Sequence, residues 1–333
     1  MSRPFEAGER ILLFDTKGRR YLVQLAPGGE FHTHSGPVRH DDLIGQEEGL
    51  LVRSTRGARY TAVRPTLAEV VLKMPRGAQV IYPKDLGPIL ILADVFPGAR
   101  VFESGLGSGA LSMALLRAGA EVTGYELRPD FAARAQANVA AFLGLGALAR
   151  YQVEVRDAYD GVADTGFDRM VLDLPEPWRL VKSAEGALRP GGILVSYLPT
   201  IGQVSALRDT LDRSAFGLAE TIEVLQRSWH VEGQSVRPDH RMVAHTGFLT
   251  SARLLGAGAR GGSGRGRGGA GAEVGPAGAG DGPAGAGEGP AGAGEGPAGA
   301  GEGPAGAGEG PAGAGEGPAG AGEGPAGADR PED

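Results

Sequence analysis

The stretch ARVFESGLGSGA, residues 99–110, decides the fold of this chain. Its apolar run ends at an acidic residue, Glu103. Three glycines follow at alternate positions, Gly105, Gly107 and Gly109, where a helical pattern begins. A turn of this kind needs glycine because the backbone must bend sharply and let a ligand approach closely, which a β-carbon would prevent. The stretch therefore predicts a nucleotide-binding loop between a strand and a helix.

A second acidic residue, Glu126, lies in TGYELRP at the end of the next apolar run, about twenty positions further on. At this spacing a carboxylate can accept hydrogen bonds from both hydroxyls of a ribose. The pattern G-x-G-x-x-A is also met by Gly105, Gly107 and Ala110. An NAD-dependent dehydrogenase is therefore an alternative at this point.

The sequence after residue 99 alternates between strand and helix patterns. Helices are expected at 110–117 and 130–143, and short apolar or β-branched runs predict strands at 100–103, 121–126, 151–156, 168–172 and 192–197. This alternation predicts a parallel sheet with crossover helices. Two late runs, 220–230 and 247–254, have no convincing helix between them and are expected to pair antiparallel at one edge. Such a seven-stranded, Rossmann-like α/β pattern resembles the class I S-adenosylmethionine-dependent methyltransferases.

Four acidic residues fall at the carboxyl ends of the first four predicted strands. Ligands of such sheets bind beyond these ends, so the four side chains should converge on one crevice. For the third of them, a helix cap is an equally good interpretation. The four residues are Glu103, Glu126, Asp157 and Asp173.

The amino-terminal part reads as a small β domain. Residues 9–25 predict a hairpin that turns at residues 15–18, and further strands are expected at 49–54 and 59–64. Helices are expected at 67–74 and 86–94. We therefore predict a small β domain over 1–65, a methyltransferase-like domain over 66–255 and a tail over 256–333.

The tail has a composition of its own. From Glu288 the unit EGPAGAG recurs, and each unit has one proline, three glycines and no large apolar residue. No helical seam or packed core can form from it, so we expect 256–333 to be disordered and acidic. The short tract of arginines at 260–267 resembles RNA-binding segments, although a flexible linker is the favoured interpretation.

Charge and composition limit the function classes. Of 33 basic and 40 acidic residues, four and eleven lie in 256–333, which leaves 29 of each in 1–255. This balance argues against nonspecific coating of nucleic acid, but local patches such as Arg53, Arg56, Arg59 and Arg64 can still bind phosphates. The chain has no cysteine, which excludes disulfides, thiolate metal sites and cysteine nucleophiles. Without a signal peptide or an apolar spanning run, a cytoplasmic protein is expected.

Histidines could suggest a metal site. His32, His34 and His40 form only an H-x-H pair with a distant third histidine, so a surface or interface role is favoured and no metal is expected.

The segment DLPEPW, residues 173–178, has the form D-x-P-x-P-W. It resembles the motif by which amino-methyltransferases hold an exocyclic amino group, although Trp178 also fits a core anchor. Further motifs are QVIYPKD at 79–85, SYLPT at 196–200, RPDHRMVAHTGFL at 237–249 and FHTH at 31–34. Together, over residues 8–255, they resemble the bacterial form of the tRNA (adenine-58-N1)-methyltransferase family.

This resemblance implies S-adenosylmethionine as methyl donor, N1 of an adenosine in the T loop of tRNA as acceptor, a homotetramer, and neither metal nor membrane. It implies that Asp173 is the catalytic acid-base residue, and that Tyr82 and Tyr197 lie against the target base. Glu126 would hold the ribose and Asp157 the adenine amino group. Cofactor contacts would also come from Glu103, Gly105, Leu106, Gly107, Ser108, Gly109 and Phe131.

The sequence departs from the family at a few positions. Phe131 stands where a histidine is common, Pro175 and Glu176 vary from several relatives, and the link between Leu116 and Glu126 is short. These changes affect loop details. Another class I amino-methyltransferase and a noncatalytic RNA-binding subunit stay open as alternatives, and the intact acids and glycines speak against the second.

Overall fold

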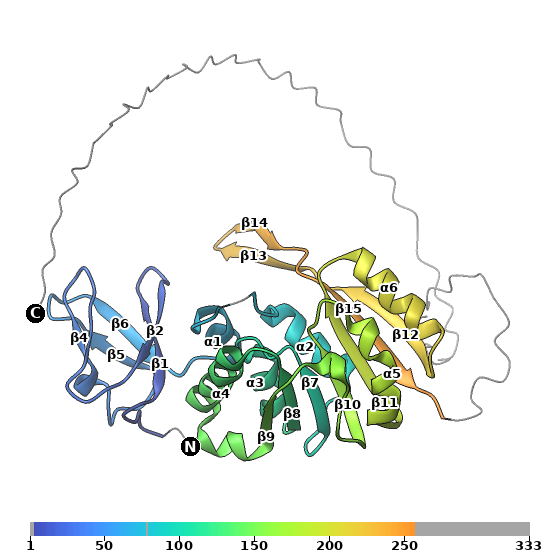
Figure 1. Cartoon of the computed structure of the whole chain (residues 1–333). Coiled ribbons are helices and arrows are strands. Elements are labelled where there is room, and N and C mark those ends of the chain that lie inside the picture. Colours follow the sequence, from blue (N-terminus) through green and yellow to red (C-terminus); the bar gives the residue numbers. More distant parts are fainter. Residues whose placement is uncertain (1–2, 78, 257–333) are drawn as a thin grey trace, which may run out of the picture. The chain divides into compact units, whose positions relative to one another are not determined.

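The computed structural model describes residues 3–77 and 79–256 of the 333-residue chain. The predicted disordered tail and its arginine tract, except for Gly256, lie outside the described residues. Figure 1 shows the arrangement of the elements, with the strands of the amino-terminal part in blue.

The amino-terminal part forms a four-stranded antiparallel sheet in the order β2-β1-β6-β5. Its strands are β1 (Arg10–Asp15), β2 (Arg20–Gln24), β5 (Leu50–Arg53) and β6 (Arg59–Val63). The predicted hairpin and the two later strands are thereby confirmed. A two-residue pair, β3 (Glu30–Phe31) with β4 (Val38–Arg39), was not predicted because each strand is too short to show an alternation. The division of the chain at residues 65 and 255 stays a prediction.

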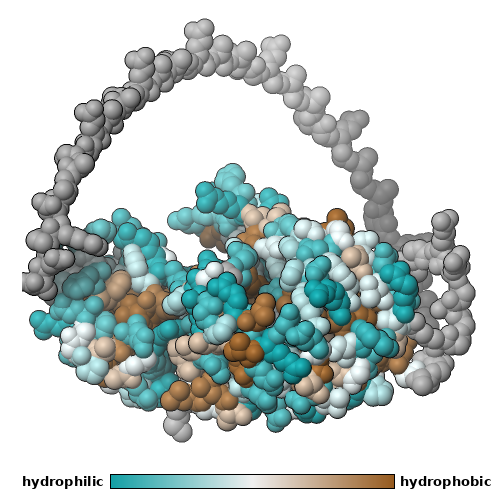
Figure 2. All heavy atoms as spheres, in the orientation of Figure 1, coloured by the Kyte–Doolittle hydropathy of each residue, from teal (hydrophilic) through white to brown (hydrophobic). Residues whose placement is uncertain are grey.

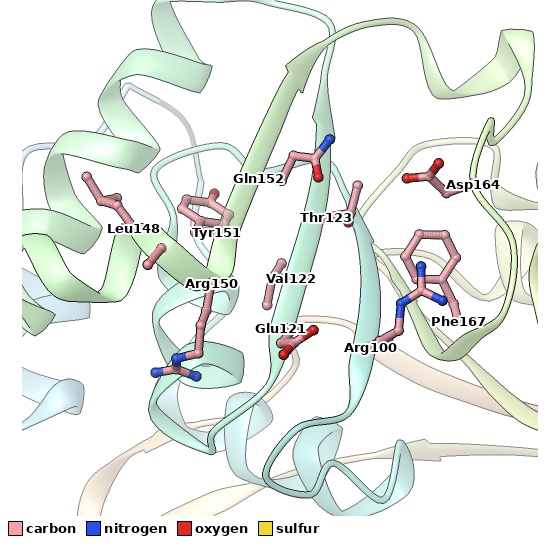
Figure 3. Close-up of a pocket in the computed structure, with 11 residues that line it drawn as sticks. Arg100, Glu121, Val122, Thr123, Leu148, Arg150, Tyr151, Gln152, Asp164 and Phe167 are labelled. Carbon is pink, nitrogen blue, oxygen red and sulfur yellow. The ribbon is translucent and has the colours of Figure 1, made fainter.

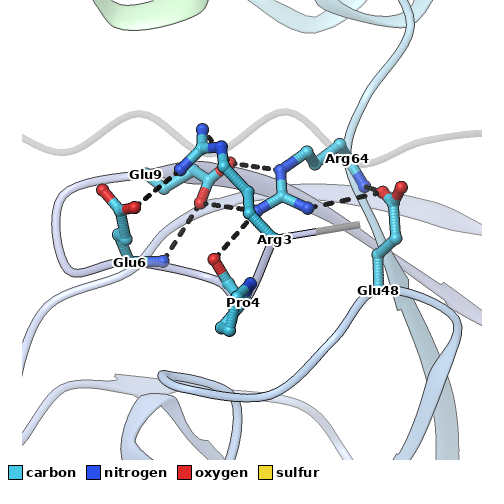
Figure 4. Close-up of polar contacts among 6 residues, drawn as sticks. All are labelled: Arg3, Pro4, Glu6, Glu9, Glu48 and Arg64. Atoms are coloured by element: carbon cyan, nitrogen blue, oxygen red, sulfur yellow. Dashed lines mark hydrogen bonds and ion pairs between the residues drawn. The ribbon is translucent and has the colours of Figure 1, made fainter. Parts of the chain in front are cut away.

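A polar cluster fixes the end of this sheet next to the following helix. Arg64 donates from Nε to Glu9 Oε1 at 2.6 Å and from Nη2 to the carbonyl of Pro4 at 3.1 Å, as Figure 4 shows. Its guanidinium also lies 4.9 Å from the ring centroid of Phe5. A single arginine thus joins the chain start, β1 and the end of β6.

The larger sheet has seven strands in the order β12-β15-β11-β10-β7-β8-β9. The five central and edge strands β9, β8, β7, β10 and β11 are parallel, and β15 is antiparallel to both of its neighbours. The predicted sheet is confirmed in strand number and direction. Its strands are β7 (Arg100–Ser104), β8 (Glu121–Glu126), β9 (Tyr151–Val155), β10 (Phe167–Leu172), β11 (Leu188–Leu198), β12 (Phe216–Glu223) and β15 (Phe248–Leu254).

Helices cover both faces of this sheet, and each face buries its own apolar core (Figure 1). One face packs against α1 (Leu67–Lys73), α2 (Pro83–Leu92), α3 (Ala110–Arg117) and α4 (Pro129–Leu143). The other packs against α5 (Val181–Ala187) and α6 (Ile201–Asp212). Among the described residues no helix is long and apolar enough to cross a membrane.

The helix α2 begins three residues before its predicted start at residue 86. Its first residue is Pro83, and proline suits this position because its missing N–H would be unpaired there anyway. Tyr82 is consequently the N-cap, in extended conformation.

The late β region corrects the prediction. The expected strand 220–230 is broken: β12 ends at Glu223, and a separate antiparallel hairpin follows, β13 (Gln226–Glu232) with β14 (Ser235–Val243). Its strands pair only with each other, and Figures 1 and 2 show it projecting beyond the helices, mostly in hydrophilic colours. A run of β-forming residues cannot reveal which of two sheets it joins.

Candidate active site

The loop between β7 and α3 is held by its glycines. Gly105 has φ 86°, and a β-carbon there would lie 2.1 Å from the carbonyl oxygen of Asp173. Gly107 also has a positive φ, 51°, but a β-carbon on it would meet no atom within 4 Å. Gly105 therefore allows the loop to pack against the end of β10, whereas Gly107 faces open space that a ligand can enter.

Glu126 contacts this loop directly. Its Oε2 accepts from the backbone N–H of Gly107 at 3.1 Å, and its Oε1 accepts from that of Arg128 at 3.1 Å. The carboxylate thus joins the end of β8 to the open side of the glycine loop. This is the position from which it could reach a ribose bound over Gly107.

Glu103 is fully buried and points toward α3 and β9. Its Oε1 accepts from Ser112 Oγ at 3.0 Å, and that hydroxyl lies 2.8 Å from the hydroxyl of Tyr151. Burial raises the pKa of Glu103 to about 8, and the negative charges of Asp173 and Glu126 contribute to this rise. The hydrogen bond from Ser112 acts in the opposite direction and lowers this pKa. Its Oε2 has no hydrogen-bond partner among the described residues. The carboxyl is therefore largely protonated at neutral pH.

Asp173 follows β10 beside the glycine loop. Its backbone N–H donates to the carbonyl of Ser104 at 2.9 Å, which fixes it next to the end of β7. Burial, and then the negative charge of Glu126, raise the pKa of Asp173 to about 7. A carboxyl with this pKa can hold or release a proton under physiological conditions.

Three other predicted cofactor residues lie around the same loop. Leu106 is buried, and its side chain packs over Gly124 of β8. Only its backbone is therefore left to contact a ligand at the loop. Ser108 is buried, and its Oγ has no hydrogen-bond partner among the described residues. Gly109 has φ 82° and begins α3, close against Ala135 of α4. The unpaired hydroxyl of Ser108 is a polar group that a bound ligand could satisfy.

Asp157 and Phe131 lie further out. Asp157 Oδ1 accepts from the N–H of Tyr159 at 2.9 Å, so it caps the short 3-10 helix Ala158–Asp160, as the alternative interpretation expected. Phe131 is buried in the first turn of α4, with the guanidinium of Arg128 4.1 Å from its ring centroid. Glu103 lies near enough to Glu126 and Asp173 to be repelled by their negative charges. Asp157 follows the end of the neighbouring strand, β9.

The two predicted acceptor-site tyrosines come from different elements. Tyr82 caps α2, and Tyr197 lies near the end of β11, where its hydroxyl donates to the carbonyl of Thr246 at 2.6 Å. Burial raises the pKa of Tyr197 to about 12, and Asp85, Asp173 and Tyr82 contribute through their charges. Tyr197 is therefore near enough to Tyr82 and Asp173 for their charges to influence it.

Sequence reasoning missed the buried network that holds this side together. Lys84 Nζ donates to Asp85 Oδ1 at 2.8 Å and to the carbonyl of Val224 at 2.7 Å, and both side chains are almost fully buried. Asp85 Oδ2 accepts from Thr246 Oγ1 at 2.7 Å. The network therefore ties α2 to both ends of the β13–β14 hairpin. The charged pair inside YPKD was its only signal in the sequence.

Trp178 lies in the short 3-10 helix Pro177–Leu180 and packs, partly buried, against the core on the α5 and α6 face. This placement agrees with the core-anchor interpretation. The surface role predicted for His40 is wrong: it is buried, and its Nδ1 accepts from the N–H of Ala26 at 3.1 Å. Among the described residues no group of three or more metal-ligating side chains is assembled.

A separate cavity of about 370 Å³ lies at the opposite end of the parallel strands, away from the glycine loop (Figure 3). It is lined by side chains from the amino ends of the parallel strands, including Arg100, Glu121, Tyr151 and Phe167. Ligands of such folds bind at the carboxyl ends of the strands, so this cavity is not the active site.

The sheet order, the glycine loop after its central strand and the acids at successive strand ends define a class I S-adenosylmethionine-dependent methyltransferase. Two family descriptions match the chain: "TrmI-like N-terminal" over residues 4–52 and "tRNA methyltransferase complex GCD14 subunit" over residues 61–246.

Curated relatives agree. The chain is 42% identical to a tRNA (adenine(58)-N(1))-methyltransferase TrmI of Thermus thermophilus, covering 73% of this chain and 96% of that protein. It is 33% identical to the tRNA (adenine(57)-N(1)/adenine(58)-N(1))-methyltransferase TrmI of Methanocaldococcus jannaschii, with coverage of 73% and 94%.

Solved structures show the same fold. The structure of the tRNA (m1A58) methyltransferase TrmI from Aquifex aeolicus matches with a TM-score of 0.65, 30% identity, and coverage of 76% of this chain and 99% of that one. A structure from Thermotoga maritima, described as a SAM-dependent O-methyltransferase, matches with a TM-score of 0.72, 31% identity, and coverage of 76% and 95%. The chain belongs to the TrmI family of tRNA (adenine-58-N1)-methyltransferases. The dehydrogenase alternative is therefore wrong.

Proposed function

We propose that this protein transfers a methyl group from S-adenosylmethionine to N1 of adenosine 58 in the T loop of tRNA. The observation that carries the proposal is the place of Asp173, a carboxyl with a pKa raised to about 7, packed against Gly105 of the glycine loop and near enough to Tyr197 for its charge to act on that side chain. Family membership supports the acceptor, since the relatives named above act on this nucleoside.

The residues around the glycine loop fit the methyl donor. Gly107 faces open space, Glu126 lies at its edge, and Ser108 has a buried hydroxyl without a partner among the described residues. When bound, S-adenosylmethionine supplies an electrophilic methyl group on a positive sulfur. We propose that the donor is held by Glu103, Gly105, Leu106, Gly107, Ser108, Gly109, Glu126, Phe131, Asp157 and Asp173.

The chemistry required of the protein follows from the acceptor. N1 of adenine carries a lone pair and needs no strong base, but its methylation makes the ring cationic and acidifies the N6 amino group. We propose that the carboxylate of Asp173 accepts a hydrogen bond from N6–H, stabilises the developing cation and can take up the proton. Tyr82 and Tyr197 would hold the everted base so that N1 is aligned with the methyl group.

We also propose a cytoplasmic homotetramer. The support is the exposed apolar surface of the β13–β14 hairpin, where Trp229 is 60% exposed, Val231 70% and Val236 59%. Exposed apolar side chains at this density on one element are typical of an interface. Sedimentation at several concentrations would measure the oligomeric state, and a monomer throughout would contradict the proposal.

The acceptor is tested by product analysis. The full chain is incubated with an unmodified tRNA transcript and labelled S-adenosylmethionine, and the nucleosides are separated after digestion. We expect label in 1-methyladenosine, and none when adenosine 58 is replaced by guanosine. Label at adenosine 57 as well would extend the specificity. Label in another nucleoside only, or transfer only to a small amine, would favour the alternative amino-methyltransferase.

A further inference from the structure

The small β domain gathers its turns at one end. The register pairs Asp15 at the end of β1 with Tyr60 at the start of β6, so the β1–β2 and β5–β6 turns lie together. The loop between β3 and β4 joins them, since the N–H of Thr55 donates to the carbonyl of Pro37 at 2.9 Å. We call residues 15–20, 32–37 and 53–59 the tip of this domain.

The tip is strongly basic. Its only acidic residue is Asp15, against six basic residues and two histidines: Lys17, Arg19, Arg20, His32, His34, Arg53, Arg56 and Arg59. Residues 1–255 as a whole have equal numbers of acidic and basic residues. The tip is therefore basic because basic residues are concentrated there, and not because residues 1–255 as a whole have an excess of them.

Most of this charge is free to meet a partner. Arg19 pairs with Asp15, and Arg20 with Glu69 of α1. Arg53, Arg56 and Arg59 are exposed, and none of them has an ion pair or hydrogen bond from its side chain within residues 3–77 and 79–256. Arg53 and Arg59 are also direct neighbours across β5 and β6, a like-charge pairing that costs stability unless an anion lies between them.

An aromatic pocket opens at the same end. The ring centroids of Tyr21 and Phe31 are 5.2 Å apart, and each lies 6.3 Å from that of Tyr60. A cavity of about 390 Å³ is bounded by these rings together with Arg19, His32 and His34. Tyr21 and Phe31 are only half-buried, so their surfaces are available to a planar group.

Arginines around half-exposed aromatic rings match the chemistry of a nucleic acid, with phosphates on the guanidinium groups and a base against the rings. We propose that the tip is a second tRNA-docking surface, which grips an unpaired nucleotide and its flanking phosphates outside the methylated loop. This inference rests on the proposed function for the identity of the RNA. The surface itself is defined by its charge and its rings.

The experiment compares two double variants of the full chain with equal loss of charge. R56Q/R59Q removes two arginines of the tip, and K182Q/R213Q removes two exposed cations on the α5 and α6 side. Binding of unmodified tRNA is measured over a range of salt concentrations, and S-adenosylmethionine affinity reports correct folding. We expect R56Q/R59Q to raise the Kd for tRNA about tenfold at low salt and to reduce the slope of log Kd against log salt by about 2.

The control variant should bind as the unaltered protein does, and both variants should keep the same turnover at saturating tRNA. Equal tRNA affinity and salt slope in the two variants would overturn the tip proposal. Displacement of tRNA by polyglutamate as readily as by an RNA oligonucleotide of equal charge would overturn its assignment to nucleic acid. If the unaltered protein binds tRNA through the tip but forms no 1-methyladenosine, the proposed function fails and the docking surface stands.

Discussion

At the scale of single residues, the proposed role of Asp173 predicts the pH dependence of methylation. Its pKa is raised to about 7 by burial and by Glu126, so the carboxylate proposed to accept from N6–H is lost as the pH falls through 7. We expect kcat/KM for tRNA to rise about tenfold per pH unit below this pKa and to level off above it. Initial rates across the neutral range measure it, and a flat profile would contradict a titrating carboxylate in this role.

Replacement of the same residue separates charge from shape. Asp173→Asn keeps the size and a carbonyl acceptor but loses the charge proposed to stabilise the methylated base. We expect a loss in turnover on the order of 10² to 10⁴, nearly as large as for Asp173→Ala, with tRNA and S-adenosylmethionine still bound. Single-turnover rates with parallel binding assays measure both. Near-normal turnover in the asparagine variant would sink the charge-based mechanism, although the family would stand.

Glu103 gives a prediction about stability. Its pKa is raised from 4.5 to about 8, so the folded state favours the protonated form, and its contribution to stability is lost as the pH rises from 4.5 through 8. Glu103→Gln does not titrate, so it should gain stability relative to the unaltered protein across this window, on the order of 5 kcal/mol. Denaturant unfolding at several pH values measures it, with the exposed Glu121→Gln as control. A difference independent of pH would contradict the buried, protonated carboxyl.

The sequence was sufficient to place the acids and glycines of the site, because each lies at the end of a short apolar run and parallel strands bring these ends together. It was not sufficient to predict which side chains form hydrogen bonds with these residues. Glu103 accepts from Ser112 on α3, which in turn contacts Tyr151 on β9, and no local pattern joins three elements. The capping role of Asp157 was one of two interpretations that its position allowed.

At the scale of elements, the buried pair Lys84–Asp85 connects α2 to the two ends of the β13–β14 hairpin through Val224 and Thr246. The carbonyl of Thr246 also accepts from Tyr197, so the network fixes a residue proposed to contact the base. We expect Thr246→Val, which removes only the bond to Asp85, to lower turnover on tRNA about tenfold with unchanged S-adenosylmethionine affinity.

The matched control for this change is Thr250→Val. Thr250 is also buried, and its hydroxyl lies 2.9 Å from that of Thr221 on the neighbouring strand β12, without a hydrogen bond to the described residues of α2. We expect a similar loss of stability in both variants but a catalytic effect only in the first. If the two variants lost turnover equally, the network would be structural and not a positioning device.

The hairpin itself marks the limit of prediction at this scale. Periodicity reveals that residues 220–230 form extended backbone, but the chain leaves the large sheet between Glu223 and Gln226, where no glycine or proline marks a break. Only Gly233, with φ 54°, signalled a turn further on. The first parallel strands were predictable because β7 and β8 are each followed by a crossover helix, whereas β13 and β14 pair only with each other.

At the scale of the whole molecule, the last element of the described fold is β15, and a hydrogen bond holds the residue that follows it. β15 ends at Leu254, and the N–H of Leu255 donates to the carbonyl of Ala215 at 3.0 Å. All residues proposed for the donor and the base lie between Tyr82 and Tyr197, and the sequence beyond residue 256 consists largely of glycine, alanine, proline and glutamate. The tail is therefore expected to be separable from catalysis.

Truncation after Gly256 tests this separation. We expect the shortened chain to keep S-adenosylmethionine affinity and turnover on tRNA within about twofold, because a segment with almost nothing apolar to bury cannot add a packed surface to the site. A second truncation after Arg267 keeps the three arginines at 260, 265 and 267 but removes the acidic repeat. If only the shorter chain lost tRNA binding, these arginines would take part in docking through their charge. If both chains bound cofactor but failed to methylate tRNA, the acidic repeat would have a role that its composition does not predict.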